Sequence, residues 1–326
     1  MDPTTPPNPF YEAYKSGMMW GVFPAITIMM IILAFGYFGN INIVCATITN
    51  KNLKGSCNWL IAFASIADSV HVTAHIFFAY TIYSGRNFVN LDLCLHVMTI
   101  SLVGLCTGNV FILLIGVDRL ISVLFPIRQR QMNKPMYLGF CVFISLIFPA
   151  YIIYLSYVNA SINPNTKVVC LIVEAMHGSP NDIYSTISLV IMAATIVCYG
   201  TVWILLRFKL NNSTSFKSMF KSLTIIMMTV FFSWLLVALM MLVTGRLGAS
   251  MEVGFYVPLY SGITVNISCA SNFYILYYFS IDYRVAFQRQ LSFILGKKFD
   301  KIEIIRTNSS VVPSKVPVKN ELARVI

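Results

Sequence analysis

The chain alternates seven long apolar stretches with short polar segments. A helix needs about 20 mainly apolar residues to cross the hydrocarbon core of a membrane, and every stretch reaches that length. The stretches lie at residues 20–49, 57–82, 94–120, 137–157, 184–208, 219–243 and 254–279. This pattern predicts an all-α membrane protein in which residues 20–280 form a seven-transmembrane helix bundle.

The composition agrees with this pattern. Hydrophobic residues make up 57% of the chain and charged residues 11%, whereas roughly 25% of the residues of a soluble domain are charged. This balance excludes a water-soluble globular protein. The first apolar stretch follows the segment MDPTTPPNPFYEAYKSG, which has no basic leader and no small-residue cleavage site. We therefore expect the first stretch to be a retained span rather than a signal peptide.

The distribution of positive charge predicts the orientation, because Lys and Arg stay on the cytoplasmic side of a membrane. All but four of the 23 lysines and arginines lie in the C-terminal tail or in one alternate set of loops. We therefore expect residues 1–19 to be an extracellular N-terminal tail and the C-terminus to lie inside. The net charge of +11 then reflects topology and attraction to anionic membrane lipid, and no nucleic acid is expected as a partner.

The segment after the last span predicts a helix on the membrane surface. Tyr283, Phe287 and Leu291 recur every four residues among basic residues. This spacing is typical of an amphipathic helix, which we place at residues 281–296 on the inner leaflet. Residues 297–326 are polar, and we expect them to form a disordered cytoplasmic tail.

Two modification sites follow from the predicted topology. Cys94 and Cys170 are the two of the eight cysteines that fall on the outside. Because disulfides form in an oxidising exterior, this pair is the one plausible disulfide, provided that the fold brings the two residues within reach. It would tie the loop at 158–183 to the bundle. Asn159 begins the one Asn-X-Ser/Thr sequence predicted in an outside loop, and is the glycosylation candidate.

Several polar residues lie at membrane depth, where such residues usually face the bundle interior and carry function. They are Asn40, Asp68, Asn109 and Asn272. Asp68 and Asn272 can satisfy each other if the second and seventh spans are neighbours, as helix-to-helix contacts, as a switch or as both. His71 and His75 share a helix face with Asp68. A proton relay or a metal site is conceivable there, but two histidines and one acid fit packing residues better, and we predict no metal site.

Three spacings between these positions resemble those of rhodopsin-like G protein-coupled receptors. Asn40 and Asp68 are 28 residues apart, Cys94 and Arg119 are 25 apart, and Arg119 and Pro126 are 7 apart. The resemblance covers residues 20 to 295. It implies a seven-helix receptor that switches between two arrangements of its bundle.

Some motifs depart from the usual pattern of these receptors. The third span ends in Asp118, Arg119 and a leucine instead of Asp-Arg-Tyr, and Tyr277 stands one place late in the Asn-Pro-x-x-Tyr motif of the seventh. This departure and the segment NFYILYYFSIDYR resemble the nematode serpentine receptor class sx chemoreceptors. Trp234 stands at the place of the sixth-span toggle tryptophan, but Leu236 replaces the proline that normally kinks that span.

The resemblance implies roles for individual residues. Arg119 would pair with Asp118 in the inactive state and turn to meet a heterotrimeric G protein in the active state. No acid between Phe208 and Met251 strengthens the inactive state, so we expect appreciable ligand-free signalling. A sodium ion near Asp68 is the one cofactor left open. The implied activation switch consists of Asn40, Asp68, Asp118, Arg119, Trp234, Asn272 and Tyr277.

The resemblance also implies a ligand pocket. Ser101 stands where receptors for amine ligands carry an Asp, and Asn266 stands where opsins carry the retinal lysine, so neither an amine anchor nor covalent retinal is expected. The implied ligand-binding residues are Phe78, Ser101, Leu105, Val237, Met241 and Asn266. This mostly apolar set fits a small neutral volatile or lipid-like ligand. A short peptide stays open, because the outer loops carry several acids.

Other classes of function fit the sequence less well. No nucleophile and base arrangement and no phosphate-binding glycine loop stands out, so we predict no enzyme. A transporter or channel that uses Asp68 and His71 would show paired repeats and spans broken by glycine and proline, and the sequence shows neither. We predict a chemosensory receptor in the plasma membrane, in sensory cilia if the ligand is an odorant. A neuropeptide receptor of the same fold is the alternative, and the cell of expression would distinguish the two.

Overall fold

A computed structural model describes residues 9–208, 214–248 and 250–295. The predicted cytoplasmic tail at 297–326 lies outside the described residues, as do residues 1–8 of the predicted N-terminal tail.

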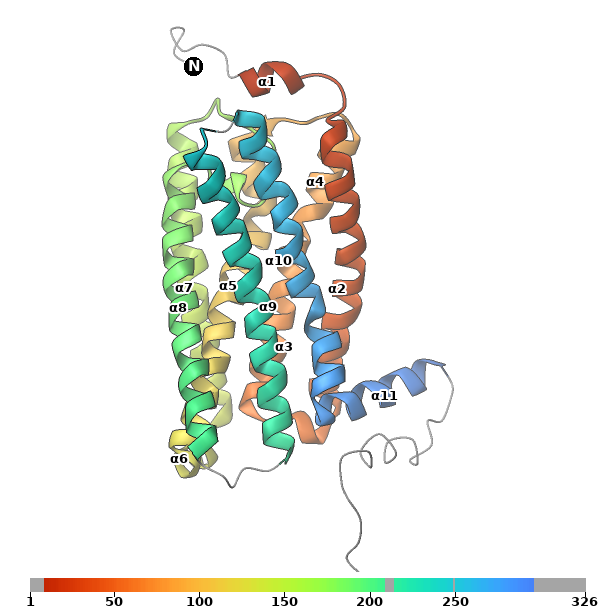
Figure 1. Ribbon diagram of the computed structural model, residues 1–326, viewed down its shortest axis with the longest axis vertical. Coiled ribbons are helices and arrows are strands. Elements are labelled where there is room, and N and C mark those ends of the chain that lie inside the picture. The colour runs from red at the N-terminus through yellow and green to blue at the C-terminus, as the bar shows by residue number, and fades with distance from the viewer. Residues whose placement is uncertain (1–8, 209–213, 249, 296–326) are drawn as a thin grey trace, which may run out of the picture.

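Seven long helices form an upright bundle (Figure 1). They are α2 (Phe23–Thr49), α3 (Ser56–Val72) continued by α4 (Ala74–Tyr83), α5 (Leu91–Leu124), α7 (Lys134–Ile162), α8 (Ser179–Phe208), α9 (Thr214–Arg246) and α10 (Met251–Phe279). In the part of the chain that the structure describes, seven helical segments are long and apolar enough to cross a membrane. The predicted seven-helix membrane bundle is therefore confirmed.

Short elements close both ends of the bundle. They are α1 (Pro9–Tyr14), η1 (Trp20–Val22), η2 (Lys51–Leu53), β1 (Val89–Asn90), α6 (Pro126–Gln131), β2 (Lys167–Val168), η3 (Glu174–Met176) and α11 (Ile281–Leu295). Strands β1 and β2 pair antiparallel, with Val89 opposite Val168. We call the end that carries α1 the outer end and the end that carries α11 the inner end (Figure 1).

The surface of the bundle is apolar where it would meet lipid. Large hydrophobic side chains such as Ile100, Phe143 and Tyr278 are 65–71% exposed, while Asn40 and Asp118 are buried at 1% exposure. A soluble protein has the reverse arrangement, because polar side chains are stabilised by contact with water and large apolar ones by burial. The distribution therefore fits a chain that is solvated by lipid along the length of its helices.

Helix α5 runs through the centre of the bundle and packs on α3, α7 and α8. Glycine allows its closest approach to α3. A Cβ atom on Gly104 would lie 2.5 Å from the backbone nitrogen of His71 and 2.6 Å from the carbonyl oxygen of Ala67. Helix α9 packs chiefly on α10, and α10 packs in turn on α2.

The outer end is closed by a disulfide and by the N-terminal segment. Cys94, in the first turn of α5, forms the predicted disulfide with Cys170, and both residues are fully buried. Helix α1 lies across the end of the bundle (Figure 1), where the ring of Phe10 lies 5.0 Å from that of Phe255. The Tyr14 hydroxyl donates to Glu252 at 3.0 Å. This bond raises the pKa of Tyr14 to about 12, so the hydroxyl keeps its proton at neutral pH.

Helix α11 is present where the sequence predicts an amphipathic helix, but its apolar stripe has a different partner. Tyr283 and Phe287 are fully buried, and the ring of Phe287 lies 4.4 Å from that of Phe273 in α10. Leu291 is half-buried. Tyr283 and Phe287 therefore dock α11 onto the bundle, and the placement of this helix on the inner leaflet stays a prediction.

Two helix boundaries differ from the sequence prediction. Helix α7 continues to Ile162, so Asn159 lies in its last turn and not in a loop. The Asn159 side-chain nitrogen, to which a glycan would attach, donates to the His177 carbonyl at 2.7 Å, and glycosylation there stays a prediction. The second span is divided at Thr73, whose hydroxyl donates to the Val70 carbonyl at 2.6 Å. This local hydrogen bond competes with the regular helical pattern.

Candidate functional site

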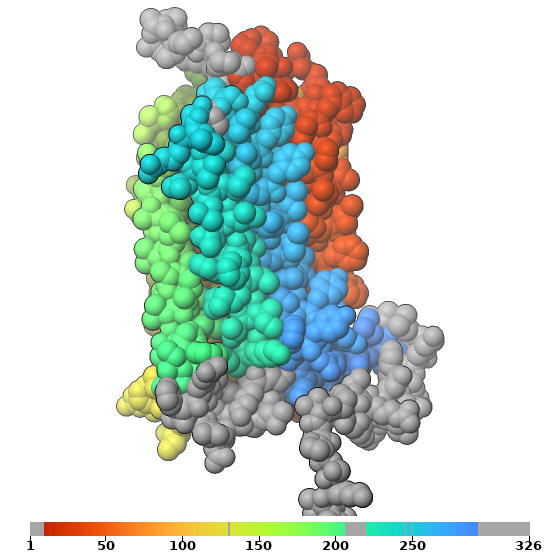
Figure 2. All heavy atoms as spheres, viewed as in Figure 1, coloured from red at the N-terminus to blue at the C-terminus, as the bar shows by residue number. Residues whose placement is uncertain are grey.

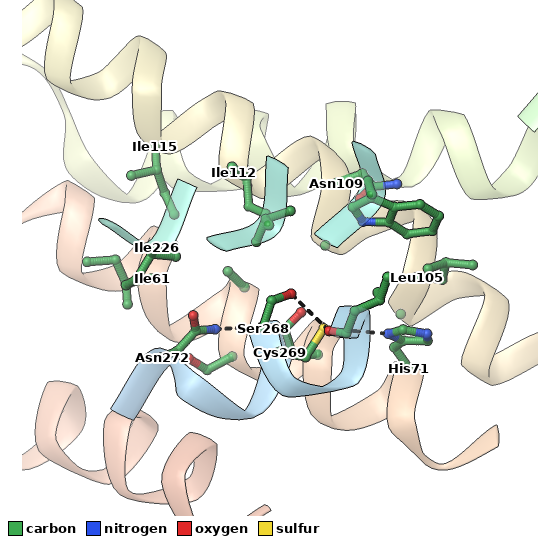
Figure 3. Close-up of a pocket in the computed structure, with 18 of the residues that line it drawn as sticks. Ile61, His71, Leu105, Asn109, Ile112, Ile115, Ile226, Ser268, Cys269 and Asn272 are labelled. Carbon is green, nitrogen blue, oxygen red and sulfur yellow. Dashed lines mark hydrogen bonds between the residues drawn. The ribbon is translucent and has the colours of Figure 1, made fainter. Parts of the chain in front are cut away.

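A cavity of about 40 Å³ lies inside the bundle between α3, α5, α8, α9 and α10 (Figure 3). Its polar lining comes from Ser65, Asp68, His71, Asn109, Ser268, Cys269 and Asn272. Apolar side chains, among them Ile61, Leu105, Ile112 and Trp234, complete the wall. The cavity therefore collects most of the polar residues that the sequence places at membrane depth.

Polar pairs join the second and seventh spans beside this cavity. The Asn272 side-chain nitrogen donates to the Asp68 carboxylate at 2.8 Å. This is the pairing that the sequence predicts if the two spans are neighbours. Asp68 is enclosed and negatively charged when ionised, and a hydrogen-bonded amide lowers the free-energy cost of keeping it there.

Two further pairs continue this row toward the outer end. His71 Nδ1 lies 3.9 Å from Cys269 Sγ, and His75 Nε2 lies 2.6 Å from Asn266 Oδ1. Residues three or four apart share one helix face, so the two antiparallel helices place 68, 71 and 75 opposite 272, 269 and 266. We call these three pairs the polar ladder. The sequence indicates that Asp68, His71 and His75 share one face of the second span, but not that Cys269 is the partner of His71.

Several buried polar atoms near the ladder have no hydrogen-bond partner in the part of the chain that the structure describes. They are Ser65 Oγ, Asn272 Oδ1 and both side-chain amide atoms of Asn40. Buried polar atoms in proteins are almost always paired with protein, water or ions. A water needs about 10–15 Å³ of such space, so the 40 Å³ cavity has room for roughly three waters or one partly hydrated cation. Drug-sized ligands occupy pockets of about 300–1,000 Å³ and do not fit in this arrangement.

Trp234 lines the cavity from α9 and lies beside Tyr184 of α8. Its ring lies 6.4 Å from that of Tyr184, which is 2% exposed. Asn109 donates to the Tyr184 hydroxyl and to Ser188 Oγ, each at 3.3 Å. The orientation of Trp234 is thus coupled to α5 through Tyr184, and sequence reasoning missed this tyrosine because no motif marks it.

The structure does not gather the six predicted ligand-binding residues around one cavity. Leu105 lines the cavity. Phe78 packs in the outer core with Met19 and Ile82, Ser101 Oγ lies 2.8 Å from Thr73 Oγ1, and Asn266 belongs to the polar ladder.

The two predicted contacts from the sixth span lie elsewhere. Val237 is half-buried and Met241 is 49% exposed on the outside of the bundle. Neither is among the residues that line the cavity. Leu236 stands where relatives carry the proline that bends this span, and α9 runs unbroken from Thr214 to Arg246.

A second group of buried polar residues, separate from the polar ladder, lies at the inner end of α5. The guanidinium of Arg119 bonds to the carboxylate of Asp118 through both Nε, at 3.2 Å, and a terminal nitrogen. Ser56 Oγ of α3 donates to the other carboxylate oxygen at 2.6 Å. Asp118 and Arg119 are 1% and 6% exposed. The predicted pairing is therefore present as a buried ion pair, and Ser56 is a partner that the sequence did not reveal.

Apolar residues close the inner end beside this pair. The rings of Tyr199 in α8 and Phe220 in α9 stack at 6.3 Å, and both residues are buried together with Leu223. A Cβ atom on Gly116 would lie 2.8 Å from the ring of Tyr199, so this glycine makes room for the tyrosine on α5. Apolar contacts thus hold α9 near Arg119 in the part of the chain that the structure describes. They stand in place of an acid on α9, which the sequence lacks.

The last predicted switch residue lies near the inner end of α10. The Tyr277 ring stacks on that of Phe273 at 6.3 Å, and its backbone carbonyl accepts a hydrogen bond of 2.8 Å from Arg284 Nε of α11. Tyr277 therefore connects α10 with α11 in this arrangement and is not in the polar ladder.

Comparison with known proteins identifies a family. A family model described as "Serpentine type 7TM GPCR chemoreceptor Srsx" matches residues 33–291. No curated protein matches the chain significantly. The matched range contains the cavity, the polar ladder and the Asp118–Arg119 pair.

Proposed function

The chain belongs to the Srsx family of serpentine seven-transmembrane chemoreceptors, and we propose that it detects a small, mostly apolar molecule and passes the signal to a heterotrimeric G protein through Arg119. It is a multi-pass membrane protein and a G protein-coupled chemoreceptor. The transporter or channel alternative is set aside, because the family is one of receptors.

The ligand class rests on the character of the outer half of the bundle. The buried side chains outward of the cavity form a largely apolar core, in which the hydroxyl of Ser101 lies 2.8 Å from that of Thr73. A charged ligand would have to be desolvated there without an opposite charge to compensate it. We propose a neutral ligand, for which the cavity would have to widen beyond its present volume. A peptide ligand stays a prediction.

The inner end supports the proposed coupling. Arg119 is held by Asp118 in a buried pair, and Asp118 is in turn fixed by Ser56 of α3 at 2.6 Å and, more weakly, by Gln129 of α6 at 3.5 Å. A ligand that favours an arrangement in which this pair separates would free a guanidinium with several donors for a partner protein. The buried Asp118–Arg119 pair at the inner end is the observation that carries the proposed function.

A ligand panel tests this function. The full chain is expressed in cells with a G protein readout and exposed to small neutral volatile and lipid-like compounds. We expect at least one compound to give a response that Arg119→Ala abolishes, because the variant lacks the group that would meet the G protein. Surface density is measured in both cases. Full signalling by Arg119→Ala at equal density would contradict the proposed coupling.

We also propose that a sodium ion binds beside Asp68. The residues present fit such an ion, because the carboxylate and the unpaired oxygens of Ser65 and Asn272 are hard oxygen donors around an enclosed space. The ion would neutralise Asp68 inside the bundle. Its binding to the folded state raises stability by about 1.4 kcal/mol when the concentration is ten times Kd.

The sodium proposal predicts an ion-specific change in stability. The melting temperature of the full chain should rise when choline chloride is replaced by sodium chloride at equal ionic strength, and Asp68→Asn should remove this rise. Potassium chloride serves as the control for general salt effects. An equal rise with potassium, or a rise that persists in Asp68→Asn, would rule out the site.

We propose the plasma membrane, and sensory cilia within it, as the place where the receptor works. The proposal follows from the chemoreceptor family and from a neutral ligand that arrives from outside. A tagged full-length chain in its own organism would test it: signal in ciliated sensory endings is expected, and signal confined to interior neurons or muscle would instead favour the neuropeptide alternative.

A further inference from the structure

A groove of about 460 Å³ runs between α9 and α10 on the outside of the bundle. The two helices lie side by side on the face toward the viewer in Figures 1 and 2. The groove exists because many of the side chains that α9 and α10 present to it are small serines and threonines. Its lining from α9 extends from Thr224 to Ser233, and its lining from α10 extends from Thr264 to Ser271.

The groove is apolar in character although it contains six hydroxyl groups. Each of these donates its proton to a backbone carbonyl: Thr224 to Phe220, Thr229 to Ile226, Ser233 to Thr229 and Thr264, Thr264 to Ser261, Ser268 to Val265, and Ser271 to Ser268. Such satisfied hydroxyls need no water. Met228, Phe232 and Ile267 form the rims and are 42–60% exposed. The groove therefore suits a hydrocarbon chain better than a polar ligand.

The length of the groove along the helices matches the thickness of one membrane leaflet. Nine residues separate Thr224 from Ser233, which corresponds to about 14 Å along a helix. The hydrocarbon core of a bilayer is about 30 Å thick, so this length is close to half of it. Because α9 runs from the inner end outward, most of residues 224–233 lie in its inner half, which ends at about residue 230. The groove thus faces the leaflet on the inner side.

A positive charge marks the inner mouth of the groove. Lys221 lies three residues before Thr224, near the start of the candidate span at Phe220, and its side chain is exposed. Lys221 Nζ lies 5.0 Å from the ring centre of Phe279, the last residue of α10, which places the ammonium between the two helices that form the groove. Arg284 adds a second cation at this end of α10, where it donates to the Tyr277 carbonyl.

We propose that this groove binds an anionic phospholipid of the cytoplasmic leaflet, with an acyl chain between α9 and α10 and the phosphate beside Lys221. The groove accounts for the chain, because its wall is dry and has the length of one leaflet. The charge accounts for the headgroup, because a lysine at a membrane surface attracts anionic lipid. The bound chain would fill the space between the two helices on their outer side.

Photolabelling of the full chain in nanodiscs tests the proposal. The nanodiscs contain phosphatidylcholine and a small fraction of phosphatidylserine whose acyl chain carries a diazirine, and labelled residues are mapped by mass spectrometry. We expect labels concentrated on Met228, Phe232 and Ile267. Lys221→Gln should lower this labelling about fivefold, the effect of one lysine near an anionic surface. Ser271→Phe should block the groove and lower labelling from either lipid class.

Matched controls make the result decisive. Lys51→Gln removes another exposed lysine from the same end of the bundle and should leave the labelling unchanged. Diazirine-labelled phosphatidylcholine should label the groove less than phosphatidylserine does and should not respond to Lys221→Gln. Equal labelling by both lipids, an equal effect of the two lysine variants, or an absence of label from the groove residues would overturn the proposal.

Discussion

Asp118→Asn should raise ligand-free G protein signalling about tenfold at equal surface density. The asparagine keeps the shape of the side chain and an oxygen that can still accept from Ser56 Oγ, which bonds to Asp118 at 2.6 Å. It removes the charge that pairs with Arg119, a residue that is 6% exposed. Breaking a buried ion pair by removing one partner costs about 3–5 kcal/mol. Only the part of this cost that is specific to the closed arrangement shifts the equilibrium, and typical couplings of about 1–3 kcal/mol correspond to about 5–150-fold.

The measurement is G protein activation in cells without added ligand, normalised to receptor at the surface. Asp182→Asn, the same chemical change at an exposed position near the outer end of α8, serves as the control and should leave the basal signal unchanged. Unchanged basal signalling in Asp118→Asn would show that the ion pair does not hold the closed arrangement.

The apolar contacts near this pair bear on how high basal signalling is in the unmodified chain. The sequence predicts appreciable ligand-free signalling, because no acid on α9 can hold Arg119. The structure adds a different restraint, since Tyr199 and Phe220 stack at 6.3 Å between α8 and α9. Burial of two aromatic rings stabilises a contact by a few kcal/mol. The missing acid removes one restraint on the closed arrangement, but the aromatic contact between α8 and α9 is a second one. High ligand-free signalling therefore stays a prediction.

The sequence was sufficient for features that depend on local pattern or on topology. Apolar length predicts the seven spans, and the side of the membrane predicts the Cys94–Cys170 disulfide. The Asp68–Asn272 contact is predicted as soon as two spans are taken to be neighbours. These features need no knowledge of how each helix is rotated about its axis.

Features that depend on helix rotation or on distant partners were not predictable in this way. Ser56 bonds to Asp118 across 62 residues of chain, and no motif marks the serine. Met241 was carried over from the family resemblance, which does not show how α9 is rotated, and its side chain is 49% exposed on the outside of the bundle. The apolar stripe of α11 was assigned to lipid because a sequence cannot show whether protein or lipid covers it.

The largest expected loss of stability comes from one added methyl group at the centre of the bundle. Gly104→Ala should lower the melting temperature of the full chain by about 5 °C or more, because the new Cβ would meet the His71 nitrogen at 2.5 Å and the Ala67 carbonyl oxygen at 2.6 Å. These are backbone atoms of a helix and cannot rotate away, so α5 must move off α3. Overpacking of this kind costs about 1–3 kcal/mol or more, and it exceeds the gain of about 0.5–1 kcal/mol that alanine normally brings to a helix.

Gly139→Ala separates the two contributions, because Gly139 also lies inside a long helix but a Cβ there would meet nothing within 4 Å. This variant should leave the melting temperature unchanged or raise it slightly, since only the helix-propensity gain remains. Both melting temperatures are measured on purified full-length chain in the same detergent. Gly104 also faces the helix that carries Asp68 and His71, so a displaced α5 would widen the cavity beside the polar ladder. If Gly104→Ala behaved like Gly139→Ala, the close contact between α3 and α5 that forms this side of the cavity would not exist in the folded receptor.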